Sequence, residues 1–312
     1  MANVAFVFPG QGSQAVGMMA EWGDFQPVVR SIFDQAAEVL GYDLWKIVAK
    51  GPETELNRTE VTQPAMLCAG VASWQVIQQL ADLPQPQLMA GHSLGEYSAL
   101  VCAQSIDFTS AVDLVATRGA LMQTAVVAGE GAMAAIIGLD DETVIQACAK
   151  VACGVVEAVN FNAPGQVVIA GHKASVEKAM ENARGVGAKR ALLLPVSVPS
   201  HCSLMQAAAE QLAEKLSKVE IAMPAIPVLH NQNVAIARST DKIRELLKKQ
   251  LYQPVKWADG IRYMQQQGID KVIECGPGKV LSGLVRRIEK SMVGQAVFDF
   301  ASLRKSAELF SQ

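Results

Sequence analysis

The chain has 312 residues, half of them hydrophobic and 5% aromatic, and its 27 basic and 30 acidic residues leave a net charge of −3. This length supports a large core in one domain with an insertion or in two domains, and no global positive charge favours nucleic acid or a membrane surface as a partner. No apolar run reaches the ~20 residues that span a bilayer, and no basic targeting region precedes residue 4, so we expect a cytoplasmic protein.

Six cysteines are scattered along the chain without C-x-x-C spacing. Several of them lie in apolar or helical runs, which favours structural thiols in a reducing compartment over a zinc site or a disulfide framework. We therefore expect no metal site. The cysteines are Cys68, Cys102, Cys148, Cys153, Cys202 and Cys275.

The first predicted strand, residues 4–8, is a continuous apolar run of the kind that a sheet buries on both faces. A glycine-rich loop, residues 9–14, follows it. The loop contains neither the Gly-Lys-Ser/Thr of a P-loop nor a full G-x-G-x-x-G, which argues against a phosphate site. It leaves exposed backbone amides near the ends of parallel strands, where open sheets usually bind ligands.

Residues 88–97 place the spacing G-x-S-x-G between a short apolar run and a helical segment. Gly91, Ser93 and Gly95 therefore predict a nucleophile elbow, a sharp strand-to-helix turn that presents the serine beside backbone N–H groups. Those donors suit a developing oxyanion. The alternative is a glycine-rich turn with a capping serine.

Arg118 lies on the apolar stripe of a helix predicted over residues 108–125. A guanidinium at this position needs an anionic partner. One interpretation is a long stem along the core whose head reaches water or pairs with a nearby carboxylate. The other is a fork that accepts a substrate carboxylate in a site closed to solvent.

From residue 131 the pattern changes to a compact βαββαβ unit, the order of a ferredoxin-like domain. The flanking segments look like parts of one doubly wound sheet, so we expect the unit to be an insertion that covers the elbow and forms a cleft. The predicted division is a larger α/β subdomain of residues 1–126 and 199–312 and a smaller ferredoxin-like subdomain of residues 127–198.

The remaining elements follow from apolar periodicity and turn residues. The predicted strands are residues 4–8, 87–90, 132–137, 155–160, 166–171, 188–194, 227–229 and 271–274. The predicted helices are residues 28–40, 64–80, 97–102, 108–125, 141–151, 174–183, 203–218, 240–250, 255–267 and 279–290. We expect the last ten or so residues to form a loosely docked tail.

Four histidines are candidates for the general base that serves Ser93. His92 adjoins the serine, and neighbours on a tight elbow point their side chains apart. His172, His201 and His230 follow the serine, as elbow enzymes require, and each could equally be a surface or core imidazole. We choose His201 because it lies where the chain returns from the insertion. The segment Val198-Pro199 before it is conformationally restricted, and a helix begins after it. No orienting carboxylate can be singled out.

Five motifs stand in a fixed order along the chain. They are Phe8-Pro9-Gly10-Gln11-Gly12-Ser13-Gln14, Gly91-His92-Ser93-Leu94-Gly95-Glu96, Arg118, Val198-Pro199-Ser200-His201 and Glu274-Cys275-Gly276-Pro277-Gly278. In this order and spacing they resemble the malonyl-CoA:acyl-carrier-protein transacylase family, over about residues 4–295. The resemblance implies an α/β fold: an α/β-hydrolase-like larger subdomain with a parallel sheet and an inserted ferredoxin-like smaller subdomain.

The catalytic roles that follow come from the resemblance. Ser93 would be the nucleophile and His201 its base. The backbone carbonyl of Gln250 would orient the histidine, which explains why no acidic member could be found. The backbone amides of Gln11 and Leu94 would form the oxyanion hole.

The resemblance also implies the substrates. Arg118 matches the arginine that holds the malonyl carboxylate, and Gln63, Asn160 and Asn162 would line the pocket. The implied reaction moves malonyl from malonyl-CoA to the phosphopantetheine thiol of acyl carrier protein for fatty acid synthesis, through a malonyl-serine and without a permanently bound cofactor. We expect a monomer. A serine thioesterase or esterase, or a transferase for another acyl-CoA such as methylmalonyl-CoA, are the alternatives.

Overall fold

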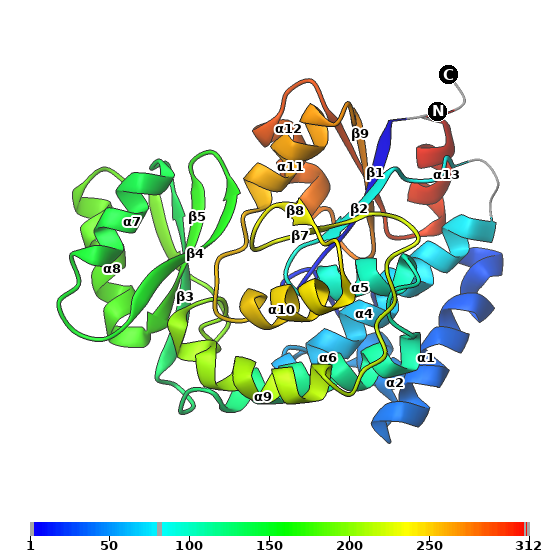
Figure 1. Cartoon of the computed structure of the whole chain (residues 1–312), viewed down its shortest axis with the longest axis horizontal. Coiled ribbons are helices and arrows are strands. Elements are labelled where there is room, and N and C mark those ends of the chain that lie inside the picture. Colours follow the sequence, from blue (N-terminus) through cyan, green and yellow to red (C-terminus); the bar gives the residue numbers. More distant parts are fainter. Residues whose placement is uncertain (1–2, 80–82, 309, 311–312) are drawn as a thin grey trace.

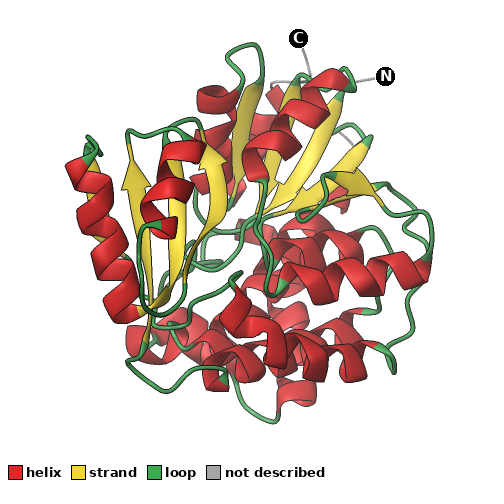
Figure 2. Cartoon of the chain, turned by 60° about the vertical axis from the view of Figure 1, so that its left-hand side comes forward, coloured by secondary structure: helices red, strands yellow, loops and turns green. Residues whose placement is uncertain are grey.

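The computed structural model of the chain describes residues 3–79, 83–308 and 310, and it contains a six-stranded and a four-stranded sheet (Figure 1). Figure 2 shows the two sheets beside each other, with helices packed around them. The strands are β1 (Val4–Phe8), β2 (Leu88–Gly91), β3 (Gly131–Ile137), β4 (Val156–Ala163), β5 (Gln166–His172), β6 (Arg190–Leu193), β7 (Val228–His230), β8 (Ala235–Ile236), β9 (Lys271–Cys275) and β10 (Val293–Val297).

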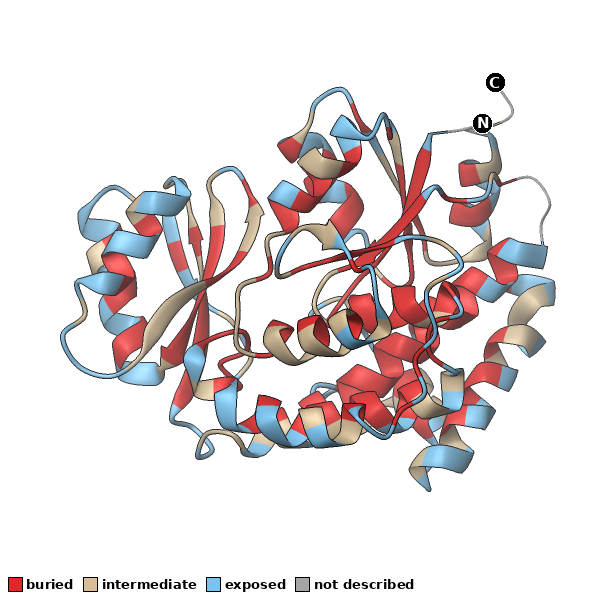
Figure 3. Ribbon diagram, viewed as in Figure 1, coloured by how far each residue is buried: buried red, intermediate tan, exposed pale blue. Residues whose placement is uncertain are grey.

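The larger sheet has the strand order β10-β9-β1-β2-β7-β8 and is parallel except for β8. Alternate side chains of β1 enter two separate apolar clusters, one on each face of the sheet. This explains why the strand is a continuous apolar run (Figure 3). The last residues of β1 and β2, Phe8 and Gly91, are paired, so the loops that follow the two strands start side by side.

The helices include two 3₁₀ turns, η1 (Gly23–Phe25) and η2 (Ser203–Met205). The α-helices are α1 (Gln26–Leu40), α2 (Leu44–Lys50), α3 (Glu53–Leu56), α4 (Thr59–Gln79), α5 (Gly95–Cys102), α6 (Phe108–Thr124), α7 (Asp141–Ala149), α8 (Lys173–Gly185), α9 (Gln206–Leu216), α10 (Thr240–Gln250), α11 (Trp257–Gln266), α12 (Val280–Ile288) and α13 (Phe300–Glu308). No described helix is long and apolar enough to cross a membrane.

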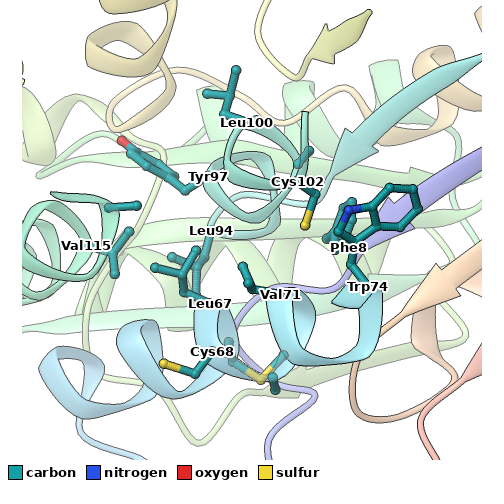
Figure 4. Close-up of a cluster of buried hydrophobic side chains, with 14 of the residues drawn as sticks. Phe8, Leu67, Cys68, Val71, Trp74, Leu94, Tyr97, Leu100, Cys102 and Val115 are labelled. Carbon is teal, nitrogen blue, oxygen red and sulfur yellow. The ribbon is translucent and has the colours of Figure 1, made fainter. Parts of the chain in front are cut away.

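Helices α4, α5 and α6 form the main core with one face of the larger sheet. Figure 4 shows this cluster, where Phe8 of β1 lies among side chains such as Val71 and Leu94. Helices α11 and α12 cover the opposite face with Ile261 and Leu284. The sheet is therefore enclosed on both sides, as its apolar strands require.

The smaller sheet has the strand order β4-β5-β3-β6, and all its pairs are antiparallel. Helices α7 and α8 cover one face. Met133 and Val168 lie on the other face, in a cluster with Cys202 of the larger part of the chain. This face, called the inner face below, therefore faces the larger sheet.

Several predicted elements differ in the structure. Helices α2 and α3 lie between the predicted helices 28–40 and 64–80, where no element was predicted, and β8 and β10 were not predicted either. Helix α4 begins before Pro64 because the N–H groups of Val61 and Thr62 bond to the Arg58 carbonyl, and the predicted end at residue 80 lies outside the described residues. Helix α11 begins after Val255 because the backbone of that residue pairs with β4.

The prediction of a loosely docked tail is wrong for the part of it that the structure describes, residues 303–308 and 310. Helix α13 packs against β10, and Leu303 and Ser306 are fully buried. The N–H of Phe300 also donates to Glu21 O at 2.9 Å. Burial of Leu303 explains this docking, because it brings the segment into the main apolar cluster.

Candidate active site

The turn between β2 and α5 has the geometry of a nucleophile elbow. Ser93 adopts a φ of 51°, in the left-handed region that non-glycine residues rarely occupy. A Cβ atom on Gly91 would lie 1.8 Å from the carbonyl carbon of Gly95, and one on Gly95 would lie 2.0 Å from Phe8 O. Only glycine fits at both positions, which is the steric reason for the G-x-S-x-G spacing.

Ser93 and His201 form a hydrogen-bonded pair. Ser93 Oγ lies 2.7 Å from His201 Nε2, and His201 Nδ1 lies 2.6 Å from the backbone oxygen of Gln250. A carbonyl oxygen can only accept, so Nδ1 carries the proton and Nε2 is left to accept the proton of the serine hydroxyl. This arrangement orients a general base without a carboxylate.

The environment keeps His201 in its neutral form. The side chain is buried, and burial together with the positive charge of Arg118 lowers its pKa to about 3. A neutral imidazole is the form that accepts a proton. The imidazole is therefore ready to act as a base at neutral pH.

The other three histidines make different contacts. His92 Nε2 lies 2.9 Å from Asn162 Oδ1, and His172 Nδ1 accepts from the N–H of Val155 at 3.0 Å. His230 is a buried imidazole whose Nδ1 lies 2.7 Å from Glu96 Oε1. Of the four, His201 is the one hydrogen-bonded to the serine hydroxyl.

Arg118 is buried at the same site, with 1% of its surface exposed. Its Nη1 donates to Gln63 Oε1 at 2.8 Å, and its Nη2 donates to Gln250 Oε1 at 3.1 Å and to Ser93 Oγ at 3.3 Å. The guanidinium also lies over the Tyr97 ring, 5.4 Å from its centroid. All three acceptors are uncharged, so the guanidinium pairs directly with no carboxylate of the described residues.

Close packing of α6 on α4 sets the position of this arginine. A Cβ atom on Gly119 would lie 2.7 Å from Glu60 Cα and 2.8 Å from Thr59 O. The missing side chain lets the two helices approach at this point. Arg118 therefore meets Gln63 of α4 directly.

A cavity of about 370 Å³ brings these groups to one surface. Its wall includes the predicted residues Ser93, His201, Arg118, Gln11, Leu94 and Asn160. The inner face of the smaller sheet contributes Met133, and the segment after β6 contributes residues 194–196. The cavity therefore lies between the two sheets, where it can take a ligand of moderate size.

Two backbone amides on this wall are available to an oxyanion. Among the described residues, the N–H groups of Gln11 and Leu94 donate to no other group of the chain, whereas the Ser93 N–H donates to Asn231 Oδ1 at 2.8 Å. The two loops touch, since a Cβ atom on Gly10 would lie 3.7 Å from Leu94 N. Unused donors at a strand end and a helix start are typical of an oxyanion hole.

Three other predicted residues lie behind the cavity wall. Gln63 contacts the guanidinium from the core side, and its Nε2 lies 3.2 Å from Met122 Sδ. Asn162 contacts His92, whose ring lies on the cavity wall. Gln250 contributes its backbone oxygen to His201 and its side chain to Arg118.

Sequence reasoning missed Asn231 and gave no role to Glu96. Asn231, the residue after β7, contacts the elbow by accepting from Ser93 N and donating to Gly91 O at 2.7 Å. Glu96 is completely buried on the elbow helix. An acidic residue inside the apolar helix of residues 95–102 was the signal available for Glu96, and no local pattern marks Asn231.

Comparisons with known proteins agree with this geometry. The family model of the acyl transferase domain matches residues 5–306. The malonyl CoA-acyl carrier protein transacylase of Escherichia coli K12 is 52% identical over 310 residues, which cover 99% of this chain and 100% of that protein. The crystal structure of an acyl carrier protein S-malonyltransferase from Vibrio cholerae has a TM-score of 0.95 and 56% identity, covering 98% of this chain and 100% of that one.

A third relative was solved with a partner. It is a malonyl-transacylase in complex with a type II PKS acyl-carrier protein, with a TM-score of 0.96 and 52% identity over 98% of this chain and 99% of that one. These matches confirm the resemblance that the motifs indicated. The chain therefore belongs to the acyl transferase family, and it is similar over nearly its whole length to malonyl CoA-acyl carrier protein transacylases.

Proposed function

We propose that the protein transfers the malonyl group of malonyl-CoA to the phosphopantetheine thiol of acyl carrier protein, for fatty acid biosynthesis. The observation that carries the proposal is a buried guanidinium that contacts no carboxylate directly among the described residues, on the same cavity wall as the Ser93–His201 pair. Relatives that are 52% identical carry the corresponding name. Malonyl is an acyl group with a carboxylate, so it fits both parts of the site.

In the first half-reaction Ser93 Oγ attacks the thioester carbonyl carbon, and its proton moves to His201 Nε2. The N–H groups of Gln11 and Leu94 stabilise the negative oxygen of the tetrahedral intermediate. The carbon–sulfur bond then breaks, and coenzyme A leaves as a thiol with the proton from His201. A malonyl-serine ester and a neutral imidazole remain.

In the second half-reaction the carrier's phosphopantetheine thiol takes the place of coenzyme A. His201 accepts the thiol proton, the sulfur attacks the ester, and the serine oxygen leaves with that proton. The sequence is ping-pong, because the first product departs before the second substrate reacts. Nucleophile, base and oxyanion donors all come from this chain, so the reaction needs no resident cofactor.

The substrate contacts follow from the same geometry. Arg118 holds the malonyl carboxylate with its fork, and Gln63 holds Arg118 from the core side. Asn160 contacts the acyl-CoA directly from the cavity wall. Asn162 acts indirectly by fixing the His92 ring beside the elbow.

The strand orders support the proposed division into subdomains. The mainly parallel sheet with helices on both faces suits an α/β-hydrolase-like subdomain, residues 1–126 and 199–312. The antiparallel order β4-β5-β3-β6 with two helices on one face suits an inserted ferredoxin-like subdomain, residues 127–198. The six thiols are free and five are buried, which supports a reducing, cytoplasmic location. The monomeric state stays a prediction.

The test of the function is the intact mass of the protein after brief exposure to malonyl-CoA. We expect a gain of one malonyl group per chain, and its complete loss when an acyl carrier protein bearing phosphopantetheine is added, with malonyl recovered on the carrier. Release of free malonate at the same rate with and without the carrier would contradict the proposal and indicate a thioesterase.

The pH dependence of acylation tests the role of His201. Transfer requires the neutral imidazole, so activity is lost only as the pH falls through the pKa of His201, which burial and Arg118 lower to about 3. We expect kcat/KM for malonyl-enzyme formation to change less than about twofold between pH 8 and 5.5, where a histidine of ordinary pKa would lose roughly tenfold. Quenched-flow measurements over this range give the profile. An acid limb centred near pH 6.5 would contradict the assignment.

A further inference from the structure

A buried carboxylate lies beneath the elbow, outside the set of groups that the reaction uses. Glu96 is completely buried and makes three hydrogen-bond contacts. One oxygen faces His230 Nδ1 at 2.7 Å, and the other accepts from Asn231 N and from Gln250 Nε2, each at 2.9 Å. Asn231 N and Gln250 Nε2 are donors, and His230 Nδ1 also donates in the tautomer that carries its proton there, so the three contacts suit a carboxylate.

The Gln250 side chain connects this carboxylate to the guanidinium. Its Oε1 accepts from Arg118 Nη2 at 3.1 Å, and its Nε2 donates to Glu96 Oε2 at 2.9 Å. The amide therefore separates the two buried groups by one neutral residue. A second donation from Nε2 to Ser93 O, at 3.0 Å, fixes the amide orientation.

We propose that Glu96 is a specificity and positioning residue: it is the resident counter-charge of Arg118, held one amide away so that the fork stays open to the malonyl carboxylate. The inference rests on the proposed function. A buried guanidinium needs nearby negative charge, yet a carboxylate in direct contact would occupy the groups that the substrate must bind. Interposing Gln250 meets both requirements.

The same carboxylate also supports the reacting pair. Asn231, whose N–H it accepts, holds Ser93 N and Gly91 O and so holds the strained turn. Gln250, whose side chain it accepts, carries the backbone oxygen that orients His201. Glu96 therefore reaches the nucleophile and the base through two residues without touching the substrate.

The charge of Glu96 has a consequence for selectivity. A bound malonyl carboxylate is repelled by Glu96, whereas the uncharged acetyl group is not. Glu96→Gln removes the charge but can keep the hydrogen bonds, because the amide oxygen can face Asn231 and Gln250 while the amide nitrogen faces the other tautomer of His230. We expect kcat/KM for malonyl-CoA relative to acetyl-CoA to rise about tenfold, as expected for a charge one amide away in a buried site.

The matched control is Glu274→Gln. Glu274 is equally buried and accepts from Leu281 N at 3.1 Å and Ser282 N at 2.7 Å, away from the cavity. A merely structural loss lowers both rates alike, so this variant should leave the ratio unchanged. Rates are normalised to the fraction of protein that forms the acyl-enzyme.

A second variant is expected to change the malonyl to acetyl ratio in the opposite direction, and it tests the role of Glu96 if Glu96→Gln does not fold. Gln250→Met has a similar size but removes the separating amide, so the guanidinium can pair with Glu96, and the malonyl to acetyl ratio should fall at least about fivefold. An unchanged ratio in either soluble variant would overturn the inference while malonyl transfer by the unmodified protein stands. Absence of a malonyl-enzyme in the unmodified protein would instead refute the proposed function.

Discussion

Replacement of Ser93 by alanine is expected to abolish the malonyl-enzyme and to lower transfer to the carrier by at least about 10⁴-fold. No other described hydroxyl is hydrogen-bonded to the His201 imidazole, so no second nucleophile can take over. Intact mass after exposure to malonyl-CoA measures the ester directly, and transfer to the carrier measures the rate. The elbow itself should persist, because Asn231 holds it through backbone atoms of Ser93 and Gly91.

Ser98→Ala is the matched control for this prediction. Ser98 lies on α5, the helix that follows the elbow, is completely buried, and its Oγ has no described hydrogen-bond partner. That variant should keep both the malonyl-enzyme and the transfer rate. A Ser93→Ala protein that still gained one malonyl group would show that another residue is the nucleophile.

The elbow was predictable because its signal is local. The G-x-S-x-G spacing lies within five residues, and β2 and α5 flank it in sequence as in space. The clash that requires glycine at position 91 is with Gly95, whereas the clash that requires glycine at position 95 is with Phe8 of β1 and depends on the fold. The choice of His201 needed more, since it lies 108 positions from Ser93. Its place at the return from the insertion favoured it, and the contact itself depends on how the two sheets meet.

The group that orients the general base cannot be recognised from its side chain. Any residue has a backbone carbonyl, so Gln250 could be named only from the resemblance and not from residue type or spacing. Asn231 and Glu96 were equally hidden, because a polar side chain beneath a turn is recognised by its partners in space. At the C-terminus, β10 is a short edge strand and α13 a short helix, and both depend on tertiary packing more than on propensity.

Arg118→Ala is expected to lower kcat/KM for malonyl-CoA by about 10²- to 10³-fold while leaving acetyl-CoA transfer unchanged or faster. Removing one partner of a buried charge pair costs roughly 3 to 4 kcal/mol, and only malonyl forms that pair. An acetyl group leaves the guanidinium unpaired, so its removal carries no such cost for acetyl-CoA. Steady-state rates with the two thioesters and one carrier protein give the comparison.

Arg244→Met is the control that separates this effect from a general loss of packing. Arg244 on α10 is half-buried, and it donates to the backbone oxygens of Leu216 at 3.2 Å and Val219 at 3.0 Å, away from the cavity. Its loss should change both thioesters by the same factor. If Arg118→Ala also lowered the two rates equally, the arginine would be a structural part of the core, and the preference for malonyl would have to come from another part of the cavity wall.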